Sequence, residues 1–312
     1  MGKLAFLFPG QGAQVVGMGK DFFDAYDLAK KRFAEADEAL GYSIRKLCFE
    51  GPADQLQLTE HTQPAILTVA VIASELLRAK GVEPEIAAGH SLGEYAALVA
   101  AGVLSFQDAV VLVHKRGAYM QEAVPVGAGA MAAIIGLADE TIVSVCSAAS
   151  EKAGAVQAVN FNCPGQTVIA GTARGVEIAV EMLREQGAKK AVILPVSAPF
   201  HSTLMKPAAK KLAAELDKVT LHDAAFPVAS NYTGELQQTA AQIKANLVAQ
   251  ADHPVRWIAC VHTMHAFGAD TYVECGPGKT LVGFNKRIDK TLVNLNVENE
   301  ASLQKTLDIL KK

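Results

Sequence analysis

The chain has 312 residues, 50% of them hydrophobic and 6% aromatic, which is enough for one large or two smaller globular domains around an aliphatic core. Its formal net charge of −3 argues against nucleic acid or an anionic membrane as a partner, and five scattered cysteines without a CxxC pair argue against zinc and disulfides. Because we find neither a signal peptide core nor an apolar run of ~20 residues, we expect a soluble cytoplasmic protein.

The chain opens with a short apolar segment and a glycine-rich turn. Residues 4–8 predict a buried strand, and residues 9–14 predict a turn before a helix from about 21 to 39. The turn lacks both the Gly-Lys-Ser/Thr and the GxGxxG spacing of nucleotide-binding loops. It could bring backbone N–H groups close to a ligand oxygen, and a plain strand-to-helix turn remains the alternative.

The next distinctive stretch surrounds a serine. A core helix over 65–77, opened by Gln63-Pro64, leads to a short strand at 85–88, and Gly89-His90-Ser91-Leu92-Gly93-Glu94 follows before a helix that starts near Tyr95. Strand, tight turn and helix in this order are typical of a nucleophile elbow, which exposes the serine hydroxyl at a strained corner. A surface turn that happens to contain serine is the alternative interpretation.

Ser105 and Asp108 form a capping box for a helix that ends near Glu122. Arg116 lies in the middle of the apolar arc of that helix, among Ala109, Leu112, Val113 and Met120. The guanidinium either reaches water along its own stem or grips a bound carboxylate with two parallel hydrogen bonds.

After a flexible joint at 126–129, the order of elements becomes βαββαβ, which is typical of a ferredoxin-like unit inserted into a larger α/β body. The strands are expected at 130–136, 156–161, 167–170 and 191–196, and the helices at 139–149 and 175–186. We therefore predict a small subdomain of residues 127–196 within a discontinuous subdomain of residues 1–126 and 197–312. The amide-rich loop 160–166 either lines a cleft or is a simple turn.

The chain leaves the small unit through Ser197-Ala198-Pro199-Phe200-His201-Ser202, just past a strand end, where function concentrates in α/β folds. His201 is therefore the preferred partner for Ser91 among the eight histidines. We expect the His90 ring to point away from the hydroxyl of Ser91. Further strands are predicted at 226–230, 271–274 and 292–297 and helices at 240–248, at 257–267 and at the C-terminus, with a strand-to-helix turn at 276–280.

Phe8 to Gln14, Gly89 to Glu94 and Pro199 to Ser202 together resemble the malonyl-CoA:acyl carrier protein transacylases of type II fatty acid synthesis. The segments 116–121, 160–166 and 276–278, together with Gln250, match further family segments, so the resemblance covers nearly the whole chain. It implies an α/β-hydrolase-like large subdomain with a parallel sheet and an inserted ferredoxin-like small subdomain.

The resemblance also implies roles. Ser91 would be the nucleophile and His201 the general base, oriented by the backbone carbonyl of Gln250. Arg116 would hold the free carboxylate of malonate. The backbone N–H groups of Gln11 and Leu92 would form the oxyanion hole. The implied substrate-binding residues are Gln63, Asn160, Phe200 and His90. An aromatic residue directly before the catalytic histidine, as Phe200 is before His201, is typical of malonyl-specific relatives.

The implied reaction transfers malonyl from coenzyme A to the phosphopantetheine thiol of acyl carrier protein through a malonyl-serine ester. Coenzyme A thioester is then a substrate, no cofactor or metal is needed, and we expect a monomer. Lys189, Lys190, Lys286 and Arg287 are candidate contacts for an acidic carrier protein, with solvated surface charge as the alternative. Alternative functions are a serine thioesterase or esterase, a trans-acting polyketide acyltransferase, and a noncatalytic protein that binds acyl carriers.

Overall fold

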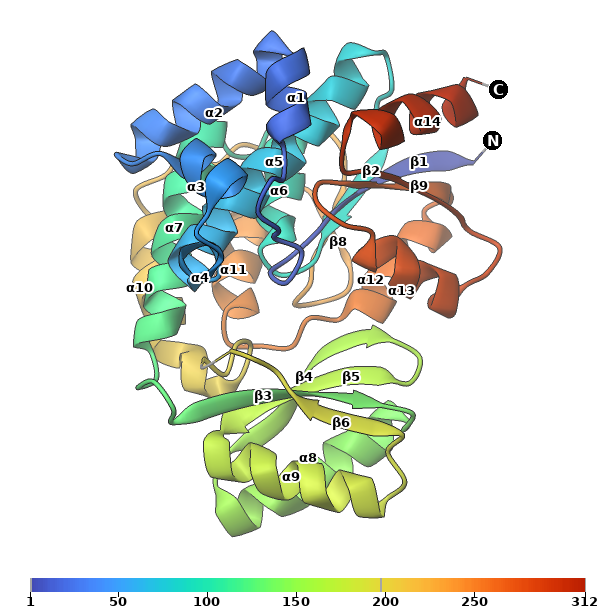
Figure 1. The fold of residues 1–312 in the computed structure, drawn as a ribbon. Helices are drawn as coiled ribbons and strands as arrows, with labels where there is room; N and C mark the ends of the chain where they lie inside the picture. The colour runs from blue at the N-terminus through green and yellow to red at the C-terminus, as the bar shows by residue number, and fades with distance from the viewer. Residues whose placement is uncertain (1, 197, 312) are drawn as a thin grey trace.

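The computed structural model describes residues 2–196 and 198–311, so the predicted boundary at Ser197 lies outside the described residues. These residues form a six-stranded sheet and a separate four-stranded sheet, each covered by helices (Figure 1). The predicted α/β class with two sheets is therefore confirmed. No helix in the described ranges has the length and apolar character needed to cross a membrane.

The larger sheet has the strand order β10-β9-β1-β2-β7-β8, in which neighbours run parallel except for the antiparallel pair β7 and β8. Phe6 and Phe8 of β1 face one hydrophobic cluster, whereas Ala5 and Leu7 face another. Burial on both faces is expected of a parallel sheet. The strands are β1 Lys3–Phe8, β2 Ile86–Gly89, β7 Val228–Ala229, β8 Leu236–Gln237, β9 Ala269–Cys275 and β10 Val293–Val297.

Helices cover both faces of this sheet. Helices α12 and α13 pack on the Leu7 side, and the others contribute to the cluster on the Phe6 side. Their bounds are α1 Lys20–Ala25, α2 Asp27–Leu40, α3 Ile44–Glu50, α4 Ala53–Leu56, α5 Thr59–Ala79, α6 Gly93–Ala100, α7 Phe106–Glu122, α10 Lys206–Leu216, α11 Ala240–Gln250, α12 Trp257–Ala266, α13 Thr280–Ile288 and α14 Glu300–Leu310.

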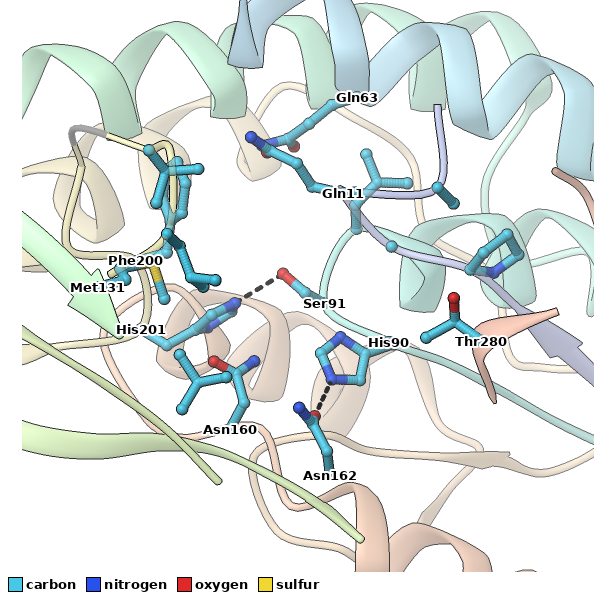
Figure 2. Close-up of a pocket in the computed structure, with 18 of the residues that line it drawn as sticks. Gln11, Gln63, His90, Ser91, Met131, Asn160, Asn162, Phe200, His201 and Thr280 are labelled. Carbon is cyan, nitrogen blue, oxygen red and sulfur yellow. Dashed lines mark hydrogen bonds between the residues drawn. The ribbon is translucent and has the colours of Figure 1, made fainter. Parts of the chain in front are cut away.

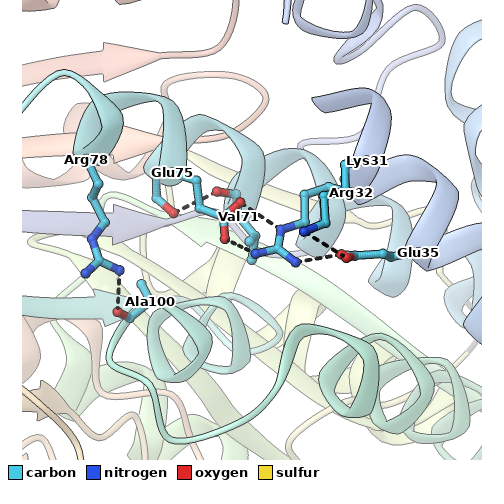
Figure 3. A network of polar contacts seen from close by, with 8 residues as sticks. Lys31, Arg32, Glu35, Val71, Glu75, Arg78 and Ala100 are labelled. Carbon is cyan, nitrogen blue, oxygen red and sulfur yellow. Dashed lines mark hydrogen bonds and ion pairs between the residues drawn. The ribbon is translucent and has the colours of Figure 1, made fainter. Parts of the chain in front are cut away.

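A partly buried ion-pair network joins helices on the Phe6 side (Figure 3). Arg32 of α2 donates two hydrogen bonds to Glu75 of α5, at 2.8 and 2.6 Å, and a third to Glu35 at 2.6 Å. Arg78, at the end of α5, donates to the carbonyl of Ala100 at 3.2 Å, where α6 ends. Because two-pronged arginine–carboxylate pairs fix geometry, the Arg32–Glu75 pair sets how α2 sits against α5. The bond from Arg78 joins the end of α6 to the same helix.

The smaller sheet has the order β4-β5-β3-β6 with antiparallel neighbours, which is the strand order of a ferredoxin-like βαββαβ unit. Its elements are β3 Gly129–Ile135, α8 Asp139–Ala153, β4 Val156–Cys163, β5 Gln166–Thr172, α9 Ala173–Glu185 and β6 Lys190–Ile193. Helices α8 and α9 lie on the face of this sheet that points away from the larger unit (Figure 1). Its other face turns toward the larger unit, where the amide of Phe161 donates to the carbonyl of Val255 at 3.0 Å.

Several element boundaries differ from the sequence prediction. The helix predicted over 21–39 is interrupted at Tyr26, whose backbone is extended, and α5 begins before Pro64 and continues through it. The strands predicted at 191–196 and 226–230 are shorter, and helices α3, α4 and α10 were not predicted. Such limits depend on tertiary packing, which overrides local propensity.

Candidate active site

The candidate site forms where parallel strands end together. Strands β1 and β2 are neighbours, with Phe8 opposite Gly89, so the turns that follow them start at the same edge of the sheet. This places Gln11 and Ser91 in the lining of one cavity, in which Figure 2 draws both. Ligands bind at this edge in α/β sheets because loops from neighbouring strands converge there.

The turn around Ser91 has the geometry of a nucleophile elbow. Ser91 has a φ of 53°, in the strained left-handed region, and its backbone amide donates to Oδ1 of Asn231 at 2.6 Å. The amide nitrogen of the Asn231 side chain donates to the Gly89 carbonyl at 2.7 Å. A Cβ on Gly93 would lie 2.0 Å from the Phe8 carbonyl oxygen. This glycine therefore allows the close approach of helix and strand, while the strained torsion falls on the serine itself.

The structure brings Ser91 and His201 into contact across 110 positions of sequence. The Oγ of Ser91 lies 2.6 Å from Nε2 of His201, and Nδ1 of His201 lies 2.8 Å from the Gln250 carbonyl (Figure 2 draws the first contact). A carbonyl only accepts, so Nδ1 carries the proton and Nε2 is free to take one from the serine. Burial, together with the charge of Arg116, lowers the pKa of His201 to about 3, which keeps the ring neutral.

The head group of Arg116 is buried beside the serine rather than extended to water. Nη2 donates to Ser91 Oγ at 3.1 Å and to Gln250 Oε1 at 2.9 Å, and Nη1 donates to Gln63 Oε1 at 2.8 Å. The side chain is 2% exposed, and burial lowers the pKa of the guanidinium. All three acceptors are uncharged, and none of the ion pairs in the described ranges involves Arg116. Such a cation attracts a carboxylate ligand strongly, because desolvated charges bind best to opposite charge.

Unused backbone donors complete the surroundings of Ser91. The amides of Gln11 and Leu92 donate to no protein acceptor in the described part of the chain, and both residues line the cavity. Leu92 directly precedes α6, where the first N–H groups of a helix lack intrahelical partners. Both donors are therefore available to an oxygen that becomes negative during a reaction at Ser91.

A cavity of about 260 Å³ opens over Ser91 between the two sheets. The predicted substrate contacts Gln63, His90, Asn160 and Phe200 all line it (Figure 2). His90 does not bond to the serine; its Nε2 lies 2.8 Å from Oδ1 of Asn162 and so ties the elbow to β4. Apolar side chains, Met131, Val168, Leu194 and Val196 among them, cover the side that belongs to the smaller unit.

The four predicted carrier contacts lie outside the cavity. Lys189, Lys190, Lys286 and Arg287 are exposed. Arg287 donates to Gln166 Oε1 at 2.8 Å and to the Pro164 carbonyl at 2.9 Å, so it joins α13 to the turn between β4 and β5. These residues therefore gather near the rim between the two units rather than at Ser91.

Sequence reasoning assigned no role to two polar residues of this site, Glu94 and Asn231. Asn162 belongs to the amide-rich segment 160–166, for which a cleft lining was one of the two interpretations, and it lines the cavity. Glu94 is fully buried in the first turn of α6 and accepts hydrogen bonds from the Asn231 amide and from the side chains of Gln237 and Gln250. A carboxylate at the head of an otherwise apolar helix was the available signal for Glu94. Asn231 gave no signal, because the residues that it contacts, Ser91 and Gly89, lie 140 and 142 positions away in sequence.

Comparison with known proteins identifies the family. The model of the acyl transferase domain matches residues 5–303. The chain belongs to the acyl transferase domain family. It is 47% identical to the malonyl CoA-acyl carrier protein transacylase of Bacillus subtilis strain 168, over 100% of this chain and 98% of that protein. It is 50% identical to the acyl-carrier-protein S-malonyltransferase of Burkholderia pseudomallei 1710b, with a TM-score of 0.95 over 98% and 99% of the chains.

A further solved structure similar to this acyl transferase is a type II polyketide synthase acyl-carrier protein in complex with its malonyl-transacylase. The likeness has a TM-score of 0.96 and 44% identity and covers 98% of this chain and 99% of that chain. Chemically, the geometry described above provides a hydroxyl, a neutral base, two free amide donors and a cation in one cavity. Acyl transfer needs the first three, and the cation adds recognition of an acid on the acyl group.

Proposed function

We propose that this acyl transferase moves a malonyl group from coenzyme A to the phosphopantetheine thiol of an acyl carrier protein through an ester on Ser91. The observation that carries the proposal is the position of Arg116, whose Nη2 lies 3.1 Å from the Ser91 hydroxyl. A guanidinium there reaches the free carboxylate of an acyl group attached to the serine. The names of the relatives support the same acyl group and the same carrier.

In the first half of the reaction, the Ser91 hydroxyl passes its proton to Nε2 of His201, and Oγ forms a bond to the thioester carbonyl carbon. The carbonyl oxygen becomes an oxyanion, which the amides of Gln11 and Leu92 stabilise; each such donor lowers the barrier by about 3–4 kcal/mol in measured enzymes. When the carbon–sulfur bond breaks, His201 returns the proton to the thiolate. Coenzyme A leaves, and the malonyl ester remains.

In the second half, the phosphopantetheine thiol gives its proton to His201 and its sulfur attacks the ester carbonyl. The bond to Oγ breaks, Ser91 regains the proton, and malonyl-carrier leaves. Because one thioester is exchanged for another, the overall free energy change is close to zero. The Gln250 carbonyl suffices to orient His201, since thioesters react more readily than the amides for which proteases use an acid.

The exposed basic residues are proposed to guide the carrier. Thr280, Leu281 and Phe284 of α13 line the cavity, and Lys286 and Arg287 follow on the same helix. Lys189 lies against Gly136, whose amide bonds to Gly165 next to Arg287, so these cations share one rim. Positive charge at the rim would steer an acidic partner toward the opening.

We further propose that the protein acts as a monomer in the cytoplasm. All five cysteines are unpaired and buried, which is compatible with a reducing compartment. Whether the product serves fatty acid or polyketide synthesis depends on which carrier protein the cell supplies, and the carrier in one neighbouring complex is of the polyketide type.

The proposal is tested by incubating the protein with malonyl-CoA and following the intact mass. We expect a malonyl adduct on Ser91 that persists until holo acyl carrier protein is added and then moves to the carrier. The variant Ser91→Ala should show no adduct. Release of free malonate without transfer to any carrier would instead support a thioesterase, and undiminished carrier malonylation by Ser91→Ala would support neither.

A further inference from the structure

A fully buried carboxylate behind the elbow takes no part in the proposed reaction. Glu94 follows Ser91 by three positions; its Oε2 accepts from the Asn231 amide at 3.0 Å and from Gln250 Nε2 at 2.8 Å, and its Oε1 accepts from Gln237 Nε2 at 2.6 Å. All three donors are uncharged. Buried carboxylates are usually paired with a cation, so a positive charge is expected near the carboxylate of Glu94.

The balancing charge is Arg116, one amide group away. The side chain of Gln250 donates through Nε2 to Glu94 and, at 2.9 Å, to the Ser91 carbonyl, and it accepts from Arg116 through Oε1 at 2.9 Å. The backbone carbonyl of the same residue accepts from His201 at 2.8 Å. Gln250 therefore touches the serine, the histidine and the arginine, and the carboxylate of Glu94 holds it from behind.

The chemistry of the three groups allows only one orientation of the amide. A guanidinium only donates, and an ionised carboxylate only accepts. The oxygen of Gln250 must therefore face Arg116, and the nitrogen must face Glu94. Gln237 is oriented in the same way, because its nitrogen donates to Glu94 while its oxygen accepts from Asn246 at 2.8 Å.

We propose that Glu94 is a positioning residue for acyl transfer, which acts through the Gln250 amide to hold Arg116, Ser91 and His201 in their reactive arrangement. The inference rests on the proposed function of the same site. Because the amide separates the two charges, Arg116 is balanced without being occupied by a carboxylate of the protein. Its neutral acceptors Gln63 and Ser91 are weaker partners than a carboxylate, so a malonyl group can replace them.

This role predicts a pH dependence that a purely structural role would not give. Burial raises the pKa of Glu94 to about 7, against the opposing effect of its hydrogen bonds. Protonation adds a donor among three donors and so disturbs Gln250. The charged or titratable groups that face Glu94 are Arg116 on α7, Tyr95 on α6 and Cys260 on α12. Burial raises the pKa of Tyr95 to about 12 and raises the pKa of the Cys260 thiol well above its usual value, so neither group titrates near neutral pH.

The test measures malonylation of Ser91 in a single turnover with malonyl-CoA across about pH 5 to 9. We expect the parent rate to fall as the pH drops through about 7, although the pKa of His201 lies near 3. In Glu94→Gln the rate should no longer fall as the pH drops through about 7. At pH 8 the variant should react about 10- to 100-fold more slowly than the parent, because small misplacements of reacting groups cause losses of this size. Glu274→Gln is the matched control, since Glu274 is equally buried, with its pKa also raised to about 7, and contacts α13 instead. The Glu274→Gln protein should keep the parent's fall in rate as the pH drops through about 7.

Gln237→Leu provides a second variant that leaves Glu94 in place. It removes a hydrogen-bond donor that lowers the pKa of Glu94, so the fall in rate should occur at higher pH than in the parent. A Glu94→Gln protein with the parent rate and pH profile, or a Gln237→Leu protein whose rate falls at the same pH as the parent's, would overturn the inference. A parent protein that malonyl-CoA does not acylate at all would instead overturn the proposed function, so the two failures are distinguishable.

Discussion

The Nη2 of Arg116 lies 3.1 Å from the Oγ of Ser91, so the hydroxyl that donates to His201 also accepts from a cation. This contact has two consequences of opposite sign. The guanidinium stabilises negative charge on Oγ, yet its charge contributes to the low pKa of His201. A carboxylate bound to Arg116 would offset that charge and make the histidine a stronger base. Malonyl would therefore assist its own transfer in a way that an uncharged acyl group cannot.

Replacement of Arg116 tests this asymmetry. In Arg116→Ala, malonyl transfer should fall roughly 30- to 5000-fold, because losing one partner of a buried charge pair costs about 2–5 kcal/mol. Acetyl transfer should fall much less or even rise, since His201 is relieved of a nearby positive charge. The measurement is kcat/KM for malonyl-CoA and acetyl-CoA with the same carrier. Equal losses on both substrates would show that Arg116 only supports the fold.

The basic residues at the rim of the cavity should affect binding of the carrier protein and leave the acylation of Ser91 by malonyl-CoA unchanged. Lys286→Glu reverses a charge on an exposed side chain that makes no hydrogen bond to described residues, so it should raise the KM for an acidic carrier several-fold, and more at low salt. Acylation of Ser91 by malonyl-CoA should stay near the parent rate. Lys152→Glu is the control, because Lys152 is exposed in the last turn of α8, and this helix lies on the face of the smaller sheet that points away from the larger unit (Figure 1). Identical KM values for the two variants would show that Lys286 is a solvated surface charge with no part in binding the carrier.

The glycine at the start of α6 should be irreplaceable for a steric reason. In Gly93→Ala the new Cβ would lie 2.0 Å from the Phe8 carbonyl oxygen, a backbone atom that cannot move aside cheaply. We expect a loss of stability of at least about 1–3 kcal/mol, with loss of Ser91 acylation. Gly283→Ala is the control: it lies inside α13 with nothing within 4 Å of the added Cβ. That change should stabilise the protein by about 0.5–1 kcal/mol. Urea unfolding of both variants measures the difference, and equal midpoints would contradict the steric account.

Local patterns predicted those parts of the molecule whose structure is set locally. The apolar run before Ser91 and the helix-forming run after it predict strand, turn and helix. The apolar arc predicts that Arg116 lies on the buried face of its helix, but it left open whether the guanidinium reaches water or binds a carboxylate. The βαββαβ order was likewise readable, because each element of the small unit has its own periodicity. The position of His201 just past a predicted strand end singled it out among the eight histidines. The resemblance to a family then supplied the Gln250 carbonyl and the oxyanion-hole amides of Gln11 and Leu92.

What the sequence could not predict is the polar network between distant segments. Glu94 meets Gln250 from 156 positions away, and Asn231 meets Ser91 from 140. Such contacts depend on the packing of α11 and of the β7 loop against the elbow, which no local pattern encodes. The break at Tyr26 is of the same kind, since the flanking residues favour helix on both sides and only the tertiary arrangement interrupts them.

The pH dependence of stability provides a last test, at Glu274. Burial raises its pKa from 4.5 to about 7, so the folded protein binds more protons than the unfolded chain between these values. The corresponding stability is fully present below about pH 4.5 and is lost as the pH rises through about 7. Glu274→Gln mimics the neutral form, so its stability relative to the parent should grow by up to about 3 kcal/mol from pH 5 to 8. Glu94 and His201 titrate in both proteins and cancel in this difference. Urea unfolding at several pH values measures it, and a difference that is constant with pH would mean that Glu274 is already ionised at pH 5.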